Sequence, residues 1–188
     1  MVEIVPYKDS WPAEFYKIGS ALRQGLGELA LRIDHIGSTS VPGLDAKDII
    51  DIQVTVAALT ETVRQAMLVL GYTPLEHIAS DHRPAGAMGA EEDWQKWYFR
   101  PPQGQRPTHL HMRVQGRANQ GYPLLFRDYL RVHPATAQAY AELKRRLAAN
   151  LADPETYPDV KDPAVDLIYL AAEEWAAATS WEPGGSDC

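Results

Sequence analysis

The residues best suited to chemistry lie in one short stretch, residues 35–52. The stretch contains a glycine followed by three hydroxyl side chains, namely Gly37, Ser38, Thr39 and Ser40. Small residues let backbone N–H groups and hydroxyls approach a phosphate closely, and Lys47 adds a positive charge. Asp51 follows, and its carboxylate can bind the divalent metal that accompanies a nucleoside triphosphate. The stretch therefore predicts a phosphate-binding loop beside a metal-binding aspartate.

A second group of polar side chains alternates along residues 108–114. His109, His111 and Arg113 share one face if this segment is a strand, because successive side chains of a strand point to opposite faces. Two imidazoles two residues apart can bind one metal ion together, or place a base over a phosphate. Imidazole favours Mn²⁺ or Zn²⁺ over Mg²⁺, which prefers oxygen. An ordinary hydrogen-bonded polar face is the alternative interpretation.

Basic residues are concentrated between residues 95 and 146, which hold ten Lys and Arg but two Asp and Glu. The whole chain is acidic, with a net charge of −7, so its overall field repels polyanions and argues against nucleic acid as a partner. The basic segment instead suits one small phosphorylated ligand, with Arg100 and Arg113 as candidate phosphate-binding residues. Solvated arginines on an ordinary surface are the alternative.

The elements that position these residues follow from hydrophobic spacing. Apolar side chains at helical intervals predict a helix over residues 11–26. Strand-like alternation follows over residues 29–33 and, most clearly, over residues 50–56, where Asp51 and Gln53 share the polar face.

Later segments alternate between the same two patterns. Strands are predicted over residues 94–100 and 108–114, and helices over residues 60–70, 122–132, 135–150 and 163–179. Residues 72–93 are predicted to form a long loop near the site. This order predicts an α+β fold with helices packed against one side of a mixed sheet. Residues 1–118 form the core of this single domain, and residues 119–188 add C-terminal helices.

The length and cysteine content exclude several classes of protein. A chain of 188 residues can bury a core without disulfides or a structural metal. Its one cysteine, Cys188, allows no disulfide framework, and the N-terminus lacks a signal-peptide pattern. No apolar run reaches the roughly 18 residues of a membrane span. The sequence predicts a cytoplasmic protein and leaves its oligomeric state open.

The stretch 35–52 resembles the GrpB-like family, and three further segments match that family in the same order. These segments are Thr108-His-Leu-His111, Leu125-Phe-Arg-Asp-Tyr-Leu-Arg131 and, through Pro134, Tyr140-Ala-Glu-Leu-Lys144. The family is grouped with the nucleotidyltransferase (polymerase-β-like) superfamily, and a related domain is fused to some bacterial dephospho-coenzyme A kinases. The resemblance implies a nucleotidyltransferase-like fold, with Gly37 and Ser38 in the phosphate-binding loop and Asp51 as the first metal ligand.

The sequence departs from the superfamily pattern where that pattern has further carboxylates. The second carboxylate would stand two residues after Asp51, where this chain has Gln53, and the third would lie on the neighbouring strand, which carries His109 and His111. A neutral amide cannot supply the negative charge that a two-metal site needs.

Three functions are compatible with these residues. In the first, the protein binds a nucleotide or another phosphorylated small molecule and transfers a nucleotidyl group. The reaction would use a divalent metal, which could be Mg²⁺, Mn²⁺ or Zn²⁺. Asp51 and His111 would then be catalytic, and both would bind the metal together with His109. The second function is a non-catalytic nucleotide-binding or regulatory module, which Gln53 favours. The third is a metal-dependent phosphohydrolase that uses the His-x-His pair.

Overall fold

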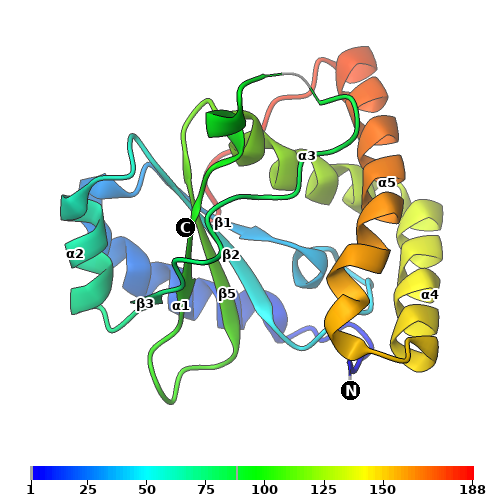
Figure 1. Cartoon of the computed structure of the whole chain (residues 1–188), viewed down its shortest axis with the longest axis horizontal. Helices are drawn as coiled ribbons and strands as arrows, with labels where there is room; N and C mark the ends of the chain where they lie inside the picture. The colour runs from blue at the N-terminus through cyan, green and yellow to red at the C-terminus, as the bar shows by residue number, and fades with distance from the viewer. Residues whose placement is uncertain (1, 88) are drawn as a thin grey trace.

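The computed structural model describes residues 2–87 and 89–188 and shows a five-stranded mixed sheet with helices on both faces (Figure 1). The strands are β1 (Arg32–Ile36), β2 (Ile50–Val56), β3 (Thr73–Pro74), β4 (Trp97–Arg100) and β5 (Thr108–Val114). The helices are α1 (Trp11–Leu26), α2 (Glu61–Val69), α3 (Ala118–Val132), α4 (Pro134–Asn150) and α5 (Tyr157–Thr179). The strand order is β1-β2-β5-β4-β3, in which β2 and β5 run parallel and the other pairs run antiparallel.

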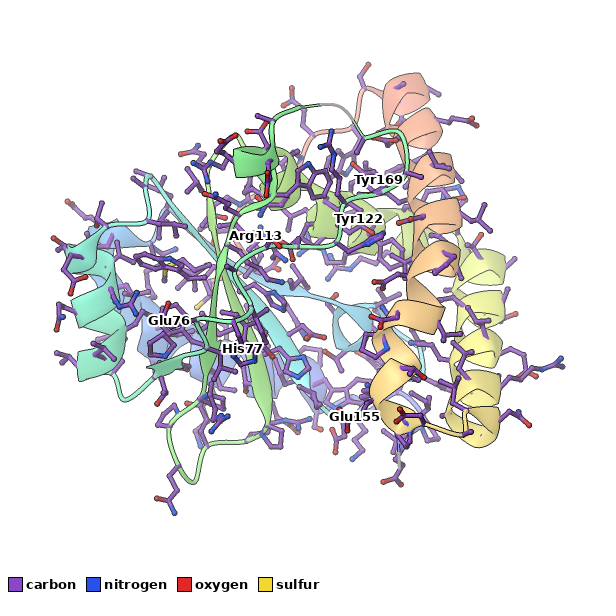
Figure 2. All side chains as sticks on the ribbon, in the orientation of Figure 1. Glu76, His77, Arg113, Tyr122, Glu155 and Tyr169 are labelled. Carbon is purple, nitrogen blue, oxygen red and sulfur yellow. The ribbon has the colours of Figure 1, made fainter. Side chains whose placement is uncertain are left out.

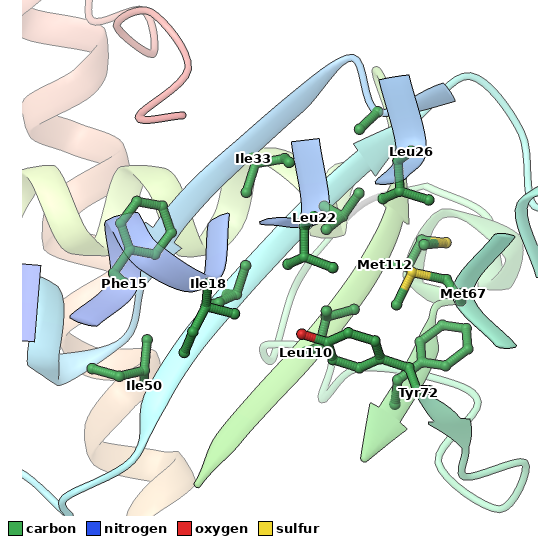
Figure 3. Close-up of a cluster of buried hydrophobic side chains, with 14 of the residues drawn as sticks. Phe15, Ile18, Leu22, Leu26, Ile33, Ile50, Met67, Tyr72, Leu110 and Met112 are labelled. Carbon is green, nitrogen blue, oxygen red and sulfur yellow. The ribbon is translucent and has the colours of Figure 1, made fainter. Parts of the chain in front are cut away.

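The apolar face of the sheet packs against α1 and α2. Leu22 of α1 and Met67 of α2 meet Ile50 of β2 and Leu110 of β5 in one buried cluster (Figure 3). Each fully buried side chain of this size contributes about 1.5–3 kcal/mol to stability. The alternation of apolar and polar residues in β2 and β5 therefore fixes which face of each strand is turned away from this core.

The C-terminal helices lie on the opposite, polar side of the sheet. There α3 contacts β1 and β5, and α5 packs against α3 and α4, with the rings of Tyr122 and Tyr169 4.2 Å apart (Figure 2). The prediction of helices on one side only is therefore wrong. Hydrogen bonds such as that from Gln53 Nε2 to the Gln120 carbonyl, at 3.0 Å, attach α3 to the polar face. Hydrophobic periodicity in the sequence cannot predict this attachment, because polar side chains make it.

Four elements begin three or more residues from their predicted starts, namely β1, β4 (Trp97, not residue 94), α3 (Ala118, not residue 122) and α5. Strand β1 starts at Arg32, not at residue 29, because pairing with β2 sets Arg32 opposite Thr55 and Ile36 opposite Asp51. Helix α5 starts at Tyr157 and contains Pro163, where the sequence predicts a start. The interior proline removes one backbone hydrogen bond without ending the helix.

Residues 72–93 are more structured than the predicted long loop. Thr73 and Pro74 form β3 against β4, Ser80 bridges to Gln95, and Glu91 begins a short 3₁₀ turn. This segment passes along the polar face of the sheet and brings side chains to it that the sequence does not place there. Across residues 2–87 and 89–188, no helix combines the length and the apolar character that a membrane crossing requires.

Candidate functional site

A cleft of about 490 Å³ opens between the polar face of the sheet and helices α4 and α5. Five of the residues singled out in the sequence line it, namely Ser38, Lys47, Asp51, His109 and His111. The parallel pairing of β2 with β5 explains this convergence, because it sets Asp51 beside His109 and Gln53 beside His111. Side chains of paired residues in adjacent strands point to the same face of the sheet.

Asp51 and His109 form a hydrogen-bonded pair at the floor of the cleft. His109 Nδ1 lies 3.0 Å from Asp51 Oδ1, and the imidazole side chain is 42% exposed. When Nδ1–H donates to this carboxylate, Nε2 keeps its lone pair. The arrangement leaves one imidazole nitrogen of His109 able to accept a proton.

His111 has the opposite hydrogen-bonding pattern. Its Nδ1 lies 3.3 Å from Lys96 Nζ and 3.3 Å from Arg113 Nη2. Both neighbours can only donate, so Nδ1 accepts and the proton resides on Nε2. Burial, and then the charges of Arg113 and Lys96, lower the pKa of His111 well below its ordinary value. In this tautomer neither nitrogen of His111 has a free lone pair, so the geometry does not favour His111 as base or metal ligand, and both roles stay predictions.

The glycine of the predicted phosphate-binding loop lies against the Asp51 carboxylate. Gly37 has φ 70° and ψ −174°, a conformation that favours glycine, and a Cβ at this position would lie 2.3 Å from Asp51 Oδ2. The loop can therefore approach the carboxylate only with glycine here. The next residue, Ser38, faces the cleft and accepts a hydrogen bond from Lys144 Nζ at 2.9 Å.

Lys144 and Lys47 are the cations of the cleft that lack an acidic partner. Lys144 is 3% exposed, and it donates to Ser38 and to the Asp45 carbonyl. Its burial, and then the nearby charge of Lys161, lower its pKa to about 7. Lys47 Nζ lies 4.1 Å from the centre of the Tyr157 ring, and burial lowers its pKa as well. No carboxylate of residues 2–87 and 89–188 lies within 4.0 Å of either ammonium group.

Two other cations on the same face have an acidic partner. Asp81 accepts hydrogen bonds from Lys96 at 2.6 Å, from Arg113 at 2.8 Å and from Asn119 at 3.0 Å. Arg113 Nη1 donates to Gln53 Oε1 at 2.7 Å, and Figure 2 shows Arg113 near the centre of the molecule. These opposite charges outweigh burial and hold the pKa of Asp81 below its usual range.

Five predicted phosphate-binding residues do not line the cleft, namely Gly37, Thr39, Ser40, Arg100 and Arg113. Arg113 is occupied by Asp81, and Arg100 is exposed at the end of β4. The hydroxyls of Thr39 and Ser40 point inward and hold the loop. Thr39 Oγ1 lies 3.0 Å from His35 Nε2, and Ser40 Oγ donates to the Gly37 carbonyl at 2.6 Å. The hydroxyls of Thr39 and Ser40 therefore already have partners within the fold, and their role as ligand contacts stays a prediction.

The sequence interpretation missed several residues of the cleft wall. Tyr140 and Lys144 come from α4, Tyr157 from α5, and Asp81 from the segment before β4. Tyr140 and Lys144 are four residues apart, so their common helix face is a signal that could have paired them. Asp81 lies in a segment without periodicity, and no local pattern indicates its position.

The donor atoms of the cleft do not fit a two-metal centre. Within the described part of the chain, no group of three His, Cys, Asp or Glu side chains is arranged to hold a metal ion. Gln53 stands where the second carboxylate would be, and it is already bound to Arg113 and to the Gln120 carbonyl. An arginine and several lysines occupy a face that a two-metal site would line with negative charge.

The fold belongs to the nucleotidyltransferase-like class. A structure of Cid1 in complex with its short product ApU superposes with a TM-score of 0.50 over 77% of this chain and 43% of that chain, at 12% identity. This likeness concerns the fold and confirms the predicted fold class.

The chain belongs to the GrpB family, because residues 1–170 match the family described as GrpB protein. The crystal structure of conserved protein GrpB from Enterococcus faecalis superposes with a TM-score of 0.71 and 32% identity, over 92% of this chain and 99% of that one. A dephospho-CoA kinase from Mycolicibacterium paratuberculosis is 36% identical over 97% of this chain and 48% of its own length. The chain therefore spans about half the length of such mycobacterial relatives. The predicted family is confirmed.

Proposed function

We propose that the cleft binds the phosphate groups of a nucleotide or of another phosphorylated small molecule, and that it does so without a two-metal centre. The observation that carries this proposal is Lys144, a cation that is 3% exposed and has neutral hydrogen-bond partners. A buried charge without a counter-charge is costly, and an anionic ligand removes that cost.

The neighbours of Lys144 supply further groups that suit a phosphate. Ser38 Oγ accepts from Lys144 and faces the cleft, so its hydroxyl can turn its proton toward a phosphate oxygen. Lys47 lines the same cleft and adds a second positive charge. His111 carries its proton on Nε2, which adds a neutral donor. Cid1, which shares the fold, is bound to its short product ApU, and this supports a nucleotide as the ligand class.

Transfer of a nucleotidyl group is a second candidate function, favoured by the hydrogen bond between Asp51 and His109. Asp51 fixes the imidazole with its Nε2 lone pair available, as a general base requires. In this reaction His109 Nε2 would take the proton of an acceptor hydroxyl while the hydroxyl oxygen attacks the α-phosphorus of a nucleoside triphosphate, and pyrophosphate would leave. A phosphohydrolase that binds metal through both histidines gains no support, because His111 lacks a free lone pair.

Titration calorimetry of the four common nucleoside triphosphates tests the proposal, with and without Mg²⁺ or Mn²⁺. We expect binding without added metal, and a loss of about tenfold or more in affinity for Lys144→Met, since a buried charge contact disappears. Lys17→Met removes an exposed lysine from α1, on the opposite side of the sheet, and is the matched control.

Two results would contradict the proposal. One is equal affinity of Lys144→Met and the wild-type protein. The other is binding that requires a divalent metal and disappears in Asp51→Asn, which would instead support the metal site predicted from the sequence. Product analysis after incubation with a nucleoside triphosphate and glycerol as acceptor separates transfer from binding. Loss of turnover in His109→Ala at unchanged affinity would identify His109 as the base.

A further inference from the structure

The C-terminal residues 184–188 lie along the outer edge of the sheet, beside β1. Ser186 Oγ accepts a hydrogen bond from the Ile33 amide at 2.8 Å, and the Cys188 amide donates to the Ile33 carbonyl at 3.1 Å. The His35 amide donates to Asp187 Oδ2 at 2.9 Å. The segment thus satisfies the backbone groups of β1 that β2 leaves free, as an added strand would.

Arg127 binds the acidic side chain of this segment, and Arg32, which is paired with Asp34, binds its backbone. Arg127 of α3 is 3% exposed, and its Nη1 donates to Asp187 Oδ2 at 2.7 Å and to the His35 carbonyl at 3.0 Å. Arg32 Nη1 donates to the Gly184 carbonyl at 2.7 Å. A buried guanidinium beside a strand edge supplies the donors that an extended acidic peptide needs.

The connection between α5 and this segment is short and weakly held. Trp181 is still attached to the helices, through a hydrogen bond from Nε1 to Asp128 Oδ2 at 3.3 Å. Glu182 and Pro183 are exposed, and the described residues offer them no hydrogen bond. Residues 184–188 can therefore leave the edge while the rest of the fold stays intact.

We propose that the β1 edge and Arg127 form a binding site for residues 184–188 of a second copy of this chain, so that two copies exchange these segments. When the segment leaves, the amides of Ile33 and His35 lose their partners. Arg127 loses Asp187 but keeps Asp128, at 2.8 Å, and the His35 carbonyl. The same segment of a second copy restores each of these contacts unchanged. The main cost of exchanging identical segments is therefore that the two copies no longer move independently. A higher protein concentration favours the exchanged dimer.

The exchange would also add a residue from the second copy to the surroundings of the cleft. Asp187 holds the amide of His35, which lies two residues before Gly37 in the loop that approaches Asp51. The identity of the occupant follows from the match between site and segment, because the acidic carboxylate meets Arg127 and the serine hydroxyl meets the Ile33 amide. This inference is independent of the proposed phosphate binding.

Disulfide trapping tests the exchange in the full chain. Cys188 is the one cysteine of the sequence, and its Sγ lies 3.5 Å from Ser20 Oγ of α1. A chain with Ser20→Cys and Cys188→Ser is mixed with the wild-type chain at high concentration and oxidised. If segments exchange, a disulfide joins the two chains, because the donor and acceptor thiols then lie within reach. A non-reducing gel and peptide mass analysis detect the linked dimer.

Two controls separate docking from random oxidation. Ser186→Ala with Asp187→Ala in the Cys188 chain removes two docking contacts, and we expect about tenfold less linked dimer. A chain with Lys17→Cys and Cys188→Ser places the thiol elsewhere on α1 and measures background oxidation. A yield of linked dimer no higher than this background overturns the proposal. A yield that Ser186→Ala and Asp187→Ala leave unchanged overturns it as well. The single variant Ser20→Cys can also form a disulfide with Cys188 within one chain. If this internal disulfide forms efficiently and the mixture gives no linked dimer, the segment docks only on its own chain.

Discussion

The two pairs of cations on the polar face differ in their surroundings, although all four are basic and at least partly buried. Lys96 and Arg113 share the carboxylate of Asp81, whereas Lys47 and Lys144 have hydroxyl, carbonyl and aromatic neighbours. The first pair shares one counter-charge within the fold. The second pair keeps its charge available for a ligand. The comparison shows that the candidate binding site is marked by cations without a neighbouring carboxylate, and not by basic residues in general.

The largest expected effect comes from removing the carboxylate that Lys96 and Arg113 share. Asp81→Ala leaves Lys96 and Arg113, with side chains 8% and 5% exposed, without an acidic partner. We expect the free energy of unfolding to fall by about 3–5 kcal/mol, because uncompensated charges then remain buried. Urea denaturation measures the change, and Asp9→Ala, which removes an exposed carboxylate, provides the control. A loss below 1 kcal/mol would mean that the two cations find water instead.

A smaller effect is expected where the loop approaches Asp51. Gly37→Ala introduces a Cβ against Asp51 Oδ2 in a backbone conformation that favours glycine, so we expect a loss of about 1–3 kcal/mol in stability, with weaker nucleotide binding. Gly43→Ala is the matched control, because Gly43 has φ +77° but no atom within 4 Å of the added carbon. Thermal unfolding and calorimetric titration should separate the variants. Equal effects of both substitutions would show that backbone strain alone matters.

The pH dependence of the free energy of unfolding should reveal the shifted pKa of Lys144, one of the two cations without an acidic partner. The folded-state pKa of Lys144, about 7, is below its unfolded value near 10.4. Between these values the unfolded chain holds the proton that the folded chain has released, so stability should rise with pH. The contribution of Lys144 is at most about 1.4 kcal/mol per pH unit. We expect a shallower rise between pH 7 and 10 in Lys144→Met, measured by urea denaturation. Parallel curves for both proteins would show that Lys144 stays charged.

Ligand affinity should change with pH in the opposite direction. A phosphate prefers protonated Lys144, so nucleoside triphosphate affinity should decrease as the pH rises above about 7, by up to tenfold per pH unit. Calorimetry in buffers of different ionisation enthalpy should also detect proton uptake upon binding. Binding that is independent of pH from 7 to 9 in the wild-type protein would argue that Lys144 does not contact the ligand.

The smallest effect is expected from restoring the missing carboxylate. In Gln53→Glu, Arg113 Nη1, which lies 2.7 Å from Gln53 Oε1, should pair with the new carboxylate. We therefore expect no gain in Mg²⁺-dependent nucleotide affinity by calorimetry. Gln120→Glu, a substitution of the same type on α3, controls for added negative charge. A clear gain confined to Gln53→Glu would show that a single carboxylate is enough to recover a metal site.

Local patterns predicted the parts of the molecule in which side chains alternate or repeat regularly. The bounds of β2 and β5 agree with the prediction to the residue, and Asp51, His109 and His111 share the predicted polar face. The helix over residues 11–26 also agrees. Alternation determines a strand's face because half of its side chains must enter the core. The functional roles of these residues stay predictions.

Contacts between distant segments decided the rest. The sequence could not assign a partner to Arg113, because Asp81 lies 32 residues away in a segment without a regular pattern. It likewise gave no reason to separate Lys144 from its basic neighbours in α4. The spacing of apolar and polar residues determined by itself which faces are buried, since burial of apolar surface acts on every turn and strand. Which charges remain without a partner depended on the tertiary structure, because electrostatic pairing requires particular atoms within a few ångströms.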